Sequence, residues 1–300
     1  MMRILSVASE AYPLIKTGGL ADVVGALPGA LKPHGMAVTT LLPGYPGVLA
    51  ALKQPRVLHH YDDLLGHSAR VLQSEMSGHP LLVLDIPELF TRAGGPYGDA
   101  KGADWKDNWR RFAALGRAAA DLASGVVAGI AFEILHAHDW QAGLAPAYLR
   151  YAPGPGKAAA SVFTVHNIAF QGRFEQAIFP MLGLPPQAYS IEGVEYYGGV
   201  SFLKAGLTSA DAITTVSPGY AREIQQPEFG MGLEGVIRAR AGIVWGIVNG
   251  IDRDIWDPSR DTALAAAYDS GTLSQRRINK NAIDAHFGLS PDPGPLFTVV

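Results

Sequence analysis

The chain has 300 residues, of which 48% are hydrophobic and 17% are charged, and its formal net charge is −3 at pH 7. This composition excludes an intrinsically disordered chain, because enough apolar surface is present to offset the entropy lost on folding. A general nucleic-acid binder is also disfavoured, since the sequence has no long basic run. The absence of cysteine excludes disulfides, thiolate metal sites and a cysteine nucleophile, and it fits a cytoplasmic location.

The first residues lead directly into a short apolar run, without the charged segment, apolar core and cleavage site of a signal peptide. Gly, Pro or charged residues interrupt every apolar stretch before the roughly 20 residues that a membrane span needs. We therefore expect neither a secretory leader nor a membrane anchor.

Strand-like apolar runs alternate with helical patterns along most of the chain. Strands are predicted at 3–9, 37–42, 56–61, 69–75, 81–86, 134–138, 161–166 and 212–216. Helices are predicted at 20–31, 104–128 and 141–151, and another is expected to begin at Pro218. This alternation predicts an α/β fold with a mostly parallel sheet that helices cover on both faces.

The last part of the chain has a different character. Residues 246–252 contain a turn-forming Asn-Gly pair and look like a crossover between domains, and residues 273–287 have a helical pattern. Residues 296–300 form an apolar β-type run at which the sequence stops. We expect one domain over 1–245 and, over 246–300, a crossover and the incomplete start of a second domain, so that the chain is the N-terminal part of a longer protein.

The most informative stretch is Lys16-Thr17-Gly18-Gly19-Leu20-Ala21-Asp22, which joins the first predicted strand to the first predicted helix. Backbone N–H groups at a helix start lack intrahelical partners, and the helix dipole places partial positive charge there. Two glycines would let a phosphate approach this backbone, and Lys16 would add a full charge. The alternative is an ordinary turn with a solvated lysine, since the two common nucleotide-binding glycine patterns are absent.

The same stretch, with further segments in the same order, resembles the bacterial glycogen synthases and plant starch synthases. The other matching segments are LLPGYP at 41–46, HAHDWQ at 136–141, TVHNIAFQG at 164–172, TVSP at 215–218, EFGMGLEG at 228–235 and GIVNGID at 246–252. The resemblance is collinear and spans nearly all of the chain, which makes it more specific than any single motif.

The resemblance implies a Rossmann-like doubly wound domain, the N-terminal one of two that face each other across a cleft in the GT-B arrangement. It also implies a retaining glucosyltransferase that moves glucose from ADP-glucose to an α-1,4-glucan such as glycogen, with no cofactor. The family's basic pair and a glutamate of the nucleotide-binding half have no counterpart in these residues. We therefore expect the chain by itself to bind the donor poorly and to turn over negligibly.

The resemblance also assigns roles to polar residues that follow the predicted strands. By this assignment Lys16, Asp139 and His166 are catalytic, and Lys16, Gly18, Gly19 and Asn249 contact the donor phosphates. Asp22, Tyr97, His138, Trp140, Asn167 and Gln171 bind the acceptor and the transferred sugar. Ligands of open α/β sheets bind outside the carboxyl ends of the strands, so these residues are expected to meet there. For Tyr97 the alternative is a loop tyrosine with no role.

Two patterns imitate metal sites, and we expect neither to hold a metal ion. His136 and His138 face the same side of a strand but lack a further ligand pair at useful spacing, and His136 could equally be a packed strand residue. Asp252-Arg253-Asp254 imitates the Asp-x-Asp motif of metal-dependent sugar transferases, but Asp254 is expected to cap the following turn.

Three other functions stay open: a related sucrose or trehalose-phosphate type synthase, a glucan-binding module without turnover and, more remotely, a flavodoxin-like electron carrier. The segments Lys-Thr-Gly-Gly-Leu and His-Ala-His-Asp-Trp favour the glucan-elongating type. The expected partners are ADP-glucose and an α-1,4-glucan, with no nucleic acid and no membrane. These residues do not distinguish ADP-glucose from UDP-glucose, and a homo-oligomer stays open.

Overall fold

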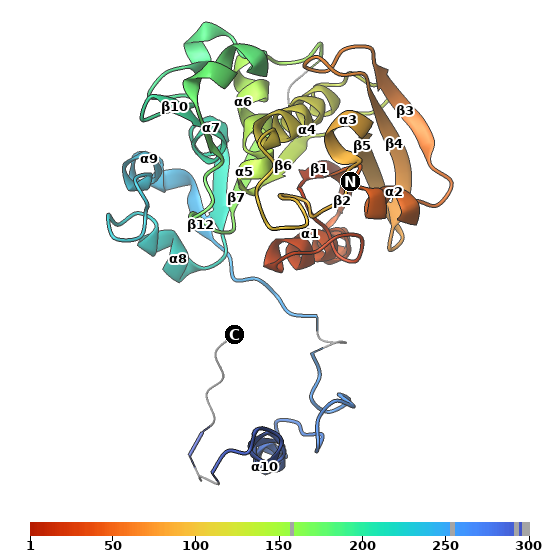
Figure 1. Cartoon of the computed structure of the whole chain (residues 1–300), viewed down its shortest axis with the longest axis vertical. Helices are drawn as coiled ribbons and strands as arrows, with labels where there is room; N and C mark the ends of the chain where they lie inside the picture. Colours follow the sequence, from red (N-terminus) through yellow and green to blue (C-terminus); the bar gives the residue numbers. More distant parts are fainter. Residues whose placement is uncertain (157–158, 253–255, 291–293, 296–300) are drawn as a thin grey trace. The chain divides into compact units, whose positions relative to one another are not determined.

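The computed structural model describes residues 1–156, 159–252, 256–290 and 294–295 (Figure 1). The chain divides into two compact units, Met1–Asn249 and Gly250–Val300, and each is described by itself. The functional division expected at 245/246 stays a prediction.

Within the described residues, the first unit is built around a nine-stranded sheet (Figure 1). In spatial order the strands are β12 (Val244–Gly246), β11 (Ala212–Thr215), β7 (Ala160–Val165), β6 (Ile134–His138), β1 (Met2–Val7), β2 (Met36–Pro43), β5 (His79–Asp85), β4 (Ala69–Met76) and β3 (Arg56–Tyr61). All neighbours from β12 to β5 pair in parallel, whereas β4 and β3 add an antiparallel edge. The predicted α/β doubly wound fold is thus confirmed.

The central strand β1 shows why the sheet has this topology. Its Ile4, Leu5 and Val7 are buried although successive side chains point to opposite faces, as expected of a strand covered on both sides. From β1 the chain moves to β2 in one direction, and it returns to build β6, β7 and β11 in the other. The order therefore reverses beside β1, where such sheets have a crevice at the carboxyl ends of the strands.

The helices of the first unit connect these strands and cover the sheet. They are α1 (Gly19–Leu31), α2 (Pro46–Ala51), α3 (Pro87–Phe90), α4 (Asn108–Ala123), α5 (Asp139–Ala142), α6 (Leu144–Tyr151), α7 (Phe202–Ser209), α8 (Pro218–Glu223) and α9 (Glu234–Ala239), with short 3₁₀ turns at Lys32–His34, Gln176–Leu182, Pro186–Ala188 and Ala241–Ile243. Crossovers that run in opposite directions from β1 place α1 and α6 on opposite faces, because each crossover is right-handed.

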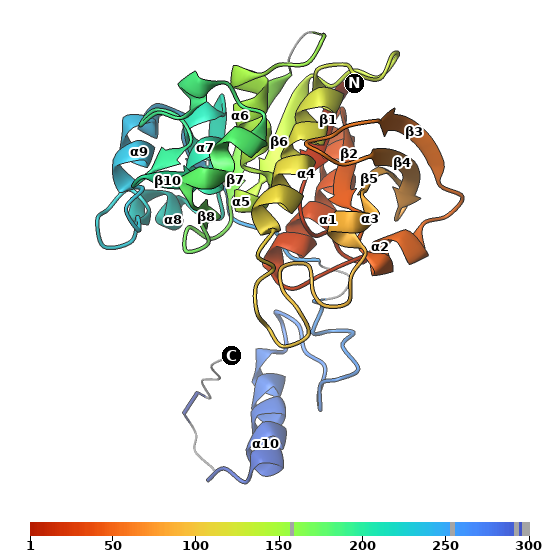
Figure 2. The ribbon, with the colours of Figure 1, turned by 45° about the horizontal axis from the view of Figure 1, so that its top comes forward.

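Helices α4, α5, α6 and α7 lie side by side as one layer (Figure 2). Their close approach depends on small residues at the contacts. A Cβ on Gly116 of α4 would lie 3.1 Å from the backbone nitrogen of Ala145, and a Cβ on Gly143 would lie 2.1 Å from the carbonyl oxygen of Phe202. Glycine is therefore required where α7 crosses the joint between α5 and α6.

Two predicted helices have different bounds in the structure. The helix expected at 104–128 covers only Asn108–Ala123, because Asp104 bridges to Gly98 in a loop and Gly125 has φ +80° just past the other end. The helix expected at 141–151 begins earlier, at Asp139, and is interrupted at Gly143. A small antiparallel sheet of β8 (Arg173–Phe174), β10 (Gly199–Ser201) and β9 (Glu195–Tyr196) was not predicted, since its strands are too short for a period-2 pattern.

In the second unit, the predicted helix 273–287 is present as a 3₁₀ turn, Leu273–Gln275, followed by α10 (Arg276–Phe287). The predicted β-type run at 296–300 and the predicted cap at Asp254 lie outside the described residues. No helix in the part of the chain that the structure describes has the length and apolar character needed to cross a bilayer.

Candidate active site

A cleft of about 1050 Å³ opens in the first unit at the carboxyl ends of the central strands. Glu10 follows β1, Asp139 follows β6 and His166 follows β7, and all three line the cleft. Of the residues that the sequence assigned to the site, the lining includes Gly18, Gly19, Tyr97, Asp139, Trp140, His166, Asn167, Gln171 and Asn249. The cleft therefore lies at the reversal of strand order, the position expected for a ligand site in this fold.

Three assigned residues lie elsewhere. The ammonium of Lys16 donates to both carboxylate oxygens of Asp22 at 2.8 Å, and both side chains are about half exposed, outside the residues that line the cleft. His138 is fully buried behind the cleft wall. The roles assigned to these three residues stay predictions.

The glycine turn has the form expected of an anion site. Gly18 is the N-cap of α1 in extended backbone, and a Cβ added to Gly18 or Gly19 would meet nothing within 4 Å. The space beside both glycines is therefore open to the cleft. The amide of Thr17, however, already donates to the Glu10 carboxylate, which leaves the amides of Gly18 and Gly19 for a ligand.

Asp139 is held in a strained and buried position. It has φ +56°, in the left-handed region that non-glycine residues rarely adopt, and it is 7% exposed. Its Oδ1 accepts from the backbone N–H of His166 at 2.7 Å and, at 3.4 Å, from that of Asn167. Burial raises the pKa of Asp139 to about 7, against the effect of these two hydrogen bonds. A carboxyl group that titrates near neutrality in a cleft is a typical functional group.

A row of three imidazoles runs inward from the cleft. His166 Nε2 and His138 Nδ1 lie 3.1 Å apart, His138 Nε2 lies 3.2 Å from Ser6 Oγ, and the rings of His136 and His138 are 4.0 Å apart. Burial lowers the pKa of His136 and of His166 to about 4, and it lowers that of His138 well below its ordinary value. The row is therefore neutral at pH 7, and His166 keeps its Nδ1 for a partner other than His138.

Glu10 is a functional residue that sequence reasoning missed. It is 2% exposed and accepts from the amide of Thr17, from the Thr17 hydroxyl at 2.7 Å and from the hydroxyl of Tyr97. Ser9 Oγ is also hydrogen-bonded to the Tyr97 hydroxyl, at 2.8 Å. Glu10 thus joins the glycine turn to the loop that carries Tyr97, over 87 positions in sequence. The available signal was a charged residue directly after a buried strand.

Trp140 lines the cleft and is also packed against aromatic neighbours. Its ring meets Phe112 edge-on at 5.0 Å between centroids and approaches Phe174 at 6.0 Å. Gly172 has φ +55°, and a Cβ there would lie 2.3 Å from the Trp140 ring. One face of Trp140 is therefore fixed by a glycine that no other residue could replace without displacement of the ring.

The charges around the cleft are mostly negative. Glu10, Asp104 and Asp139 line it, whereas Arg173 is the one cationic side chain among the described residues of the lining. No group of three His, Cys, Asp or Glu residues suited to a metal ion is found in the described part of the chain. The cleft of this unit is therefore better matched to a ligand with positive charge, or to neutral hydroxyls, than to a bare anion.

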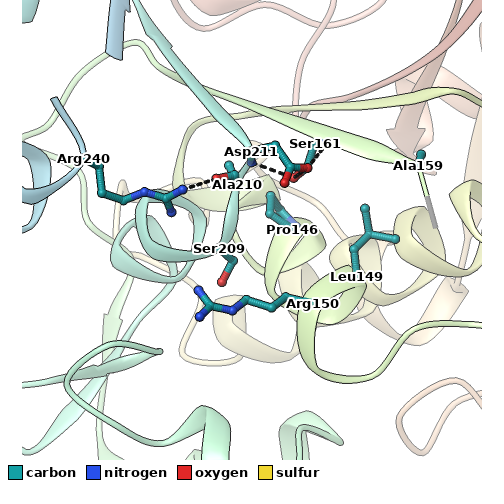
Figure 3. Close-up of a pocket in the computed structure, with 9 residues that line it drawn as sticks. All are labelled: Pro146, Leu149, Arg150, Ala159, Ser161, Ser209, Ala210, Asp211 and Arg240. Atoms are coloured by element: carbon teal, nitrogen blue, oxygen red, sulfur yellow. Dashed lines mark hydrogen bonds between the residues drawn. The ribbon is translucent and has the colours of Figure 1, made fainter. Parts of the chain in front are cut away.

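A second cavity, of about 440 Å³, lies at the opposite ends of the strands, beside the starts of β7 and β11 (Figure 3). Two arginines face it. Arg150 donates to the carbonyl of Thr208 at 2.7 Å, and Arg240 donates to the carbonyls of Leu207 and Ala210. These carbonyls belong to the C-terminal end of α7, so both guanidinium groups cap that helix.

Comparisons with known proteins identify the family of the chain. The sequence model of the family described as "Starch synthase catalytic domain" matches residues 3–239. A glycogen synthase of Novosphingobium aromaticivorans is 60% identical over 300 residues, and one of Rhizobium tropici is 56% identical over 299. Each match covers 100% of this chain and 62% of the relative, so the chain spans about three-fifths of their length.

Among solved structures, the catalytic domain of starch synthase IV from Arabidopsis thaliana, bound to ADP and acarbose, superimposes with a TM-score of 0.76 at 29% identity. The superposition covers 98% of this chain and 60% of that one. The motif resemblance to bacterial glycogen synthases and plant starch synthases is confirmed.

Proposed function

The chain belongs to the starch synthase catalytic domain family, and we propose that it is part of a retaining glucosyltransferase that extends an α-1,4-glucan from ADP-glucose. The observation that carries this proposal is the convergence of an open glycine turn, a buried Asp139 and a neutral His166 on one cleft. The starch synthase IV domain bound to ADP and acarbose supports a nucleoside diphosphate in a related cleft.

On the donor side, the amides of Gly18 and Gly19 contact the diphosphate. Both are open to the cleft and lie at the start of α1, where the helix dipole favours an anion. Lys16 contributes its charge once the donor competes with Asp22 for the ammonium group. This competition is physically reasonable, because an exposed ion pair is worth at most about 1 kcal/mol.

At the sugar, His166 acts as a hydrogen-bonding group and not as an acid. Its pKa of about 4 leaves the ring uncharged at pH 7, and its Nε2 is occupied by His138. Nδ1 is then free to contact a hydroxyl of the transferred glucose. Asp139 fixes the backbone of this loop through the amides of His166 and Asn167, so its carboxylate both places His166 and adds negative charge near the reacting ring.

The charge distribution supports a model in which different parts of the complete enzyme stabilise the two charges of the transition state. Glycosyl transfer develops positive charge on the sugar ring and negative charge on the departing diphosphate, and the negative lining of this cleft suits the ring. The diphosphate needs cations, which this lining supplies only through Arg173. We therefore propose that groups beyond Met1–Asn249 neutralise most of the leaving-group charge, and that this chain alone turns over negligibly.

One alternative has structural support. A glucan-binding module without turnover fits a cleft that combines Tyr97 and Trp140 with few cations. Aromatic rings of this kind are typical of sugar contacts, whereas low cation content argues against tight binding of a diphosphate. Binding of a glucan without transfer, in every form of the protein, would favour this reading.

The test is transfer of labelled glucose to glycogen from ADP-glucose, with UDP-glucose in parallel. It is run on this chain and on a version extended to the full length of its relatives. Transfer from ADP-glucose in the extended protein alone supports the proposal in full, with a large loss in its Lys16→Ala variant. No transfer in either folded form would contradict it. A cytoplasmic location is part of the proposal and is testable by fractionation of the source cells.

A further inference from the structure

The row of imidazoles ends at a buried hydroxyl, that of Ser6 on β1. Ser6 and His138 are both fully buried. Each ring nitrogen of His138 has one partner: Ser6 Oγ lies 3.2 Å from Nε2, and His166 Nε2 lies 3.1 Å from Nδ1. His136 takes no part in these bonds, since its own Nε2 pairs with Thr164 Oγ1 at 2.6 Å. One hydrogen-bonded chain therefore leads from the interior of the sheet to the cleft.

This chain has two possible directions, because a neutral imidazole has one N–H and one bare nitrogen. In the outward direction, the Ser6 hydroxyl donates to His138 Nε2, and His138 donates from Nδ1 to His166 Nε2. His166 then has its proton on Nδ1. In the inward direction, His166 donates from Nε2 to His138, and His138 donates from Nε2 to Ser6 Oγ. The Nδ1 of His166 is then bare.

The Ser6 hydroxyl distinguishes the two directions. Within the described part of the chain, its oxygen has no hydrogen-bond partner other than His138. In the inward direction Ser6 only accepts, so its own proton would be buried without an acceptor. In the outward direction that proton is used, and both nitrogens of His138 are still paired. Because a buried donor without a partner is costly, the outward direction is favoured.

The charge of the cleft favours the same direction. His166 lines the cleft together with Glu10, Asp104 and Asp139. Outward donation leaves His166 with an N–H for this acidic lining, whereas inward donation leaves it with a lone pair. The positive end of an N–H dipole is stabilised near negative charge, and successive hydrogen bonds of one direction strengthen each other.

We propose that Ser6, acting through His138, holds His166 in the Nδ1–H tautomer, so that His166 donates a hydrogen bond to an oxygen of the transferred sugar. A ring nitrogen is commonly assigned its proton by the bond that the other nitrogen makes. Ser6 and His138 are thus positioning residues, since neither lines the cleft. The tautomer stands independently of the transfer reaction, and only its use on a sugar rests on the proposed function.

The first test is the tautomer itself, read from nitrogen-15 NMR of this chain with labelled histidine at pH 7. The chain has nine histidines, and the signals that are missing in His138→Gln and in His166→Gln assign the two rings. Both rings are neutral at this pH, because burial lowers the pKa of His166 to about 4 and that of His138 well below its ordinary value. We expect both to be protonated on Nδ1. Protonation of His166 on Nε2, the form that imidazole prefers in water, would overturn the proposal.

The second test removes the hydroxyl. In Ser6→Ala the donor to His138 Nε2 is lost, so His166 should shift toward the Nε2–H tautomer. Thr40→Val is the matched control, because Thr40 lies opposite Ser6 on β2 and its buried hydroxyl has no partner among the described residues. Its tautomers should equal those of the wild type. An unchanged tautomer in folded Ser6→Ala, or the same shift in both variants, would contradict the role of the Ser6 hydroxyl.

The third test is transfer by the protein extended to the full length of its relatives. Ser6→Ala should lower kcat/KM for ADP-glucose about tenfold, as expected for one lost hydrogen bond, and Thr40→Val should leave it unchanged. Full transfer by Ser6→Ala with His166 in the Nε2–H form would overturn donation to the sugar. If the extended wild type transfers no glucose, the proposed function fails, whereas the NMR result still decides the tautomer.

Discussion

The two sides of the loop that carries Tyr97 are opposite in charge. On the cleft side, the Glu10 carboxylate accepts from the Tyr97 hydroxyl, and Asp139 lies in the same lining. On the other side, Arg111 and Asn108 donate to the carbonyls of Pro96 and Tyr97. Each side holds a buried charge without a counter-ion at contact distance. Both charged groups are hydrogen-bonded to the loop between them.

This difference indicates how one loop can be held from two sides by groups of unlike charge. The acidic side suits hydroxyls and a sugar ring that becomes positive, whereas on the basic side the Arg111 guanidinium packs against the rings of Tyr45, Phe90 and Phe112. Because acceptors hold the tyrosine ring and donors hold its backbone, a change on either side should shift the same residue. The following variants change one group at a time.

The largest effect is expected from Asp139→Asn. Asparagine keeps an oxygen that can accept from the amides of His166 and Asn167, and it tolerates φ +56° better than most residues. The fold should therefore persist, while loss of the negative charge should lower transfer in the extended protein about 100-fold. The measurement is kcat/KM for ADP-glucose, with circular dichroism as the control for folding. Full activity in the folded variant would show that the charge has no part in transfer.

Glu10→Gln should weaken the hydrogen bonds by which Glu10 joins the glycine turn to the Tyr97 loop. An amide can still bond to the Thr17 amide and to the two hydroxyls, but it carries no charge, so the charge-assisted hydrogen bonds become weaker neutral ones, at a cost of about 2 kcal/mol in the free energy of unfolding. Urea unfolding measures this, and hydrogen exchange should quicken in residues 16–20 and 95–98. Glu195→Gln is the control, since Glu195 accepts the amide of Gly198 at an exposed site. Equal stability of the two variants would contradict a stabilising role of the Glu10 hydrogen bonds.

The pH dependence of stability separates Asp139 from the histidines. The folded pKa of Asp139, about 7, is above its unfolded value, so between pH 4 and 7 this group makes the protein less stable as pH rises. The folded pKa of His166, about 4, is below its unfolded value, so His166 makes it more stable over pH 4 to 6.5. In Asp139→Asn the opposing contribution disappears. Urea unfolding between pH 4.5 and 6.5 should show a rise steeper than wild type by up to about 1.4 kcal/mol per pH unit. Parallel profiles would contradict the raised pKa.

The smallest effect is expected from Tyr45→Phe. Removal of a buried hydroxyl that has no partner should leave the free energy of unfolding unchanged or raise it by up to about 1 kcal/mol. A clear loss of stability in Tyr45→Phe would mean that its hydroxyl already has an acceptor, such as an ordered water.

Local sequence patterns predicted the parts of the site that depend on strand ends. Asp139 and His166 each follow a buried apolar run directly, and parallel strands bring such positions to one edge of the sheet. The same logic could not predict the pairing of Lys16 with Asp22, because that depends on how the intervening turn folds back. It also could not show that His138, adjacent to Asp139, points into the interior.

Contacts over long sequence distance account for the rest. Glu10 meets Tyr97 across 87 positions, and Arg111 meets Pro96 from within a helix whose sequence shows only an apolar stripe. Glu10 carries only the signal of a charge directly after a buried strand, and Arg111 carries none, since a charged residue in a helix is usually solvated. Burial of these charges became visible only when the tertiary packing was known.

The lining of the cleft begins at Glu10 and ends at Asn249, with contributions from several separate segments in between. During synthesis, a growing chain therefore lacks a complete ligand site until the last strands of the sheet have left the ribosome. A ligand therefore cannot stabilise the first elements by themselves. It binds and stabilises only chains in which every crossover has formed. Cleft occupancy would in this way report on the completeness of folding of the whole first unit.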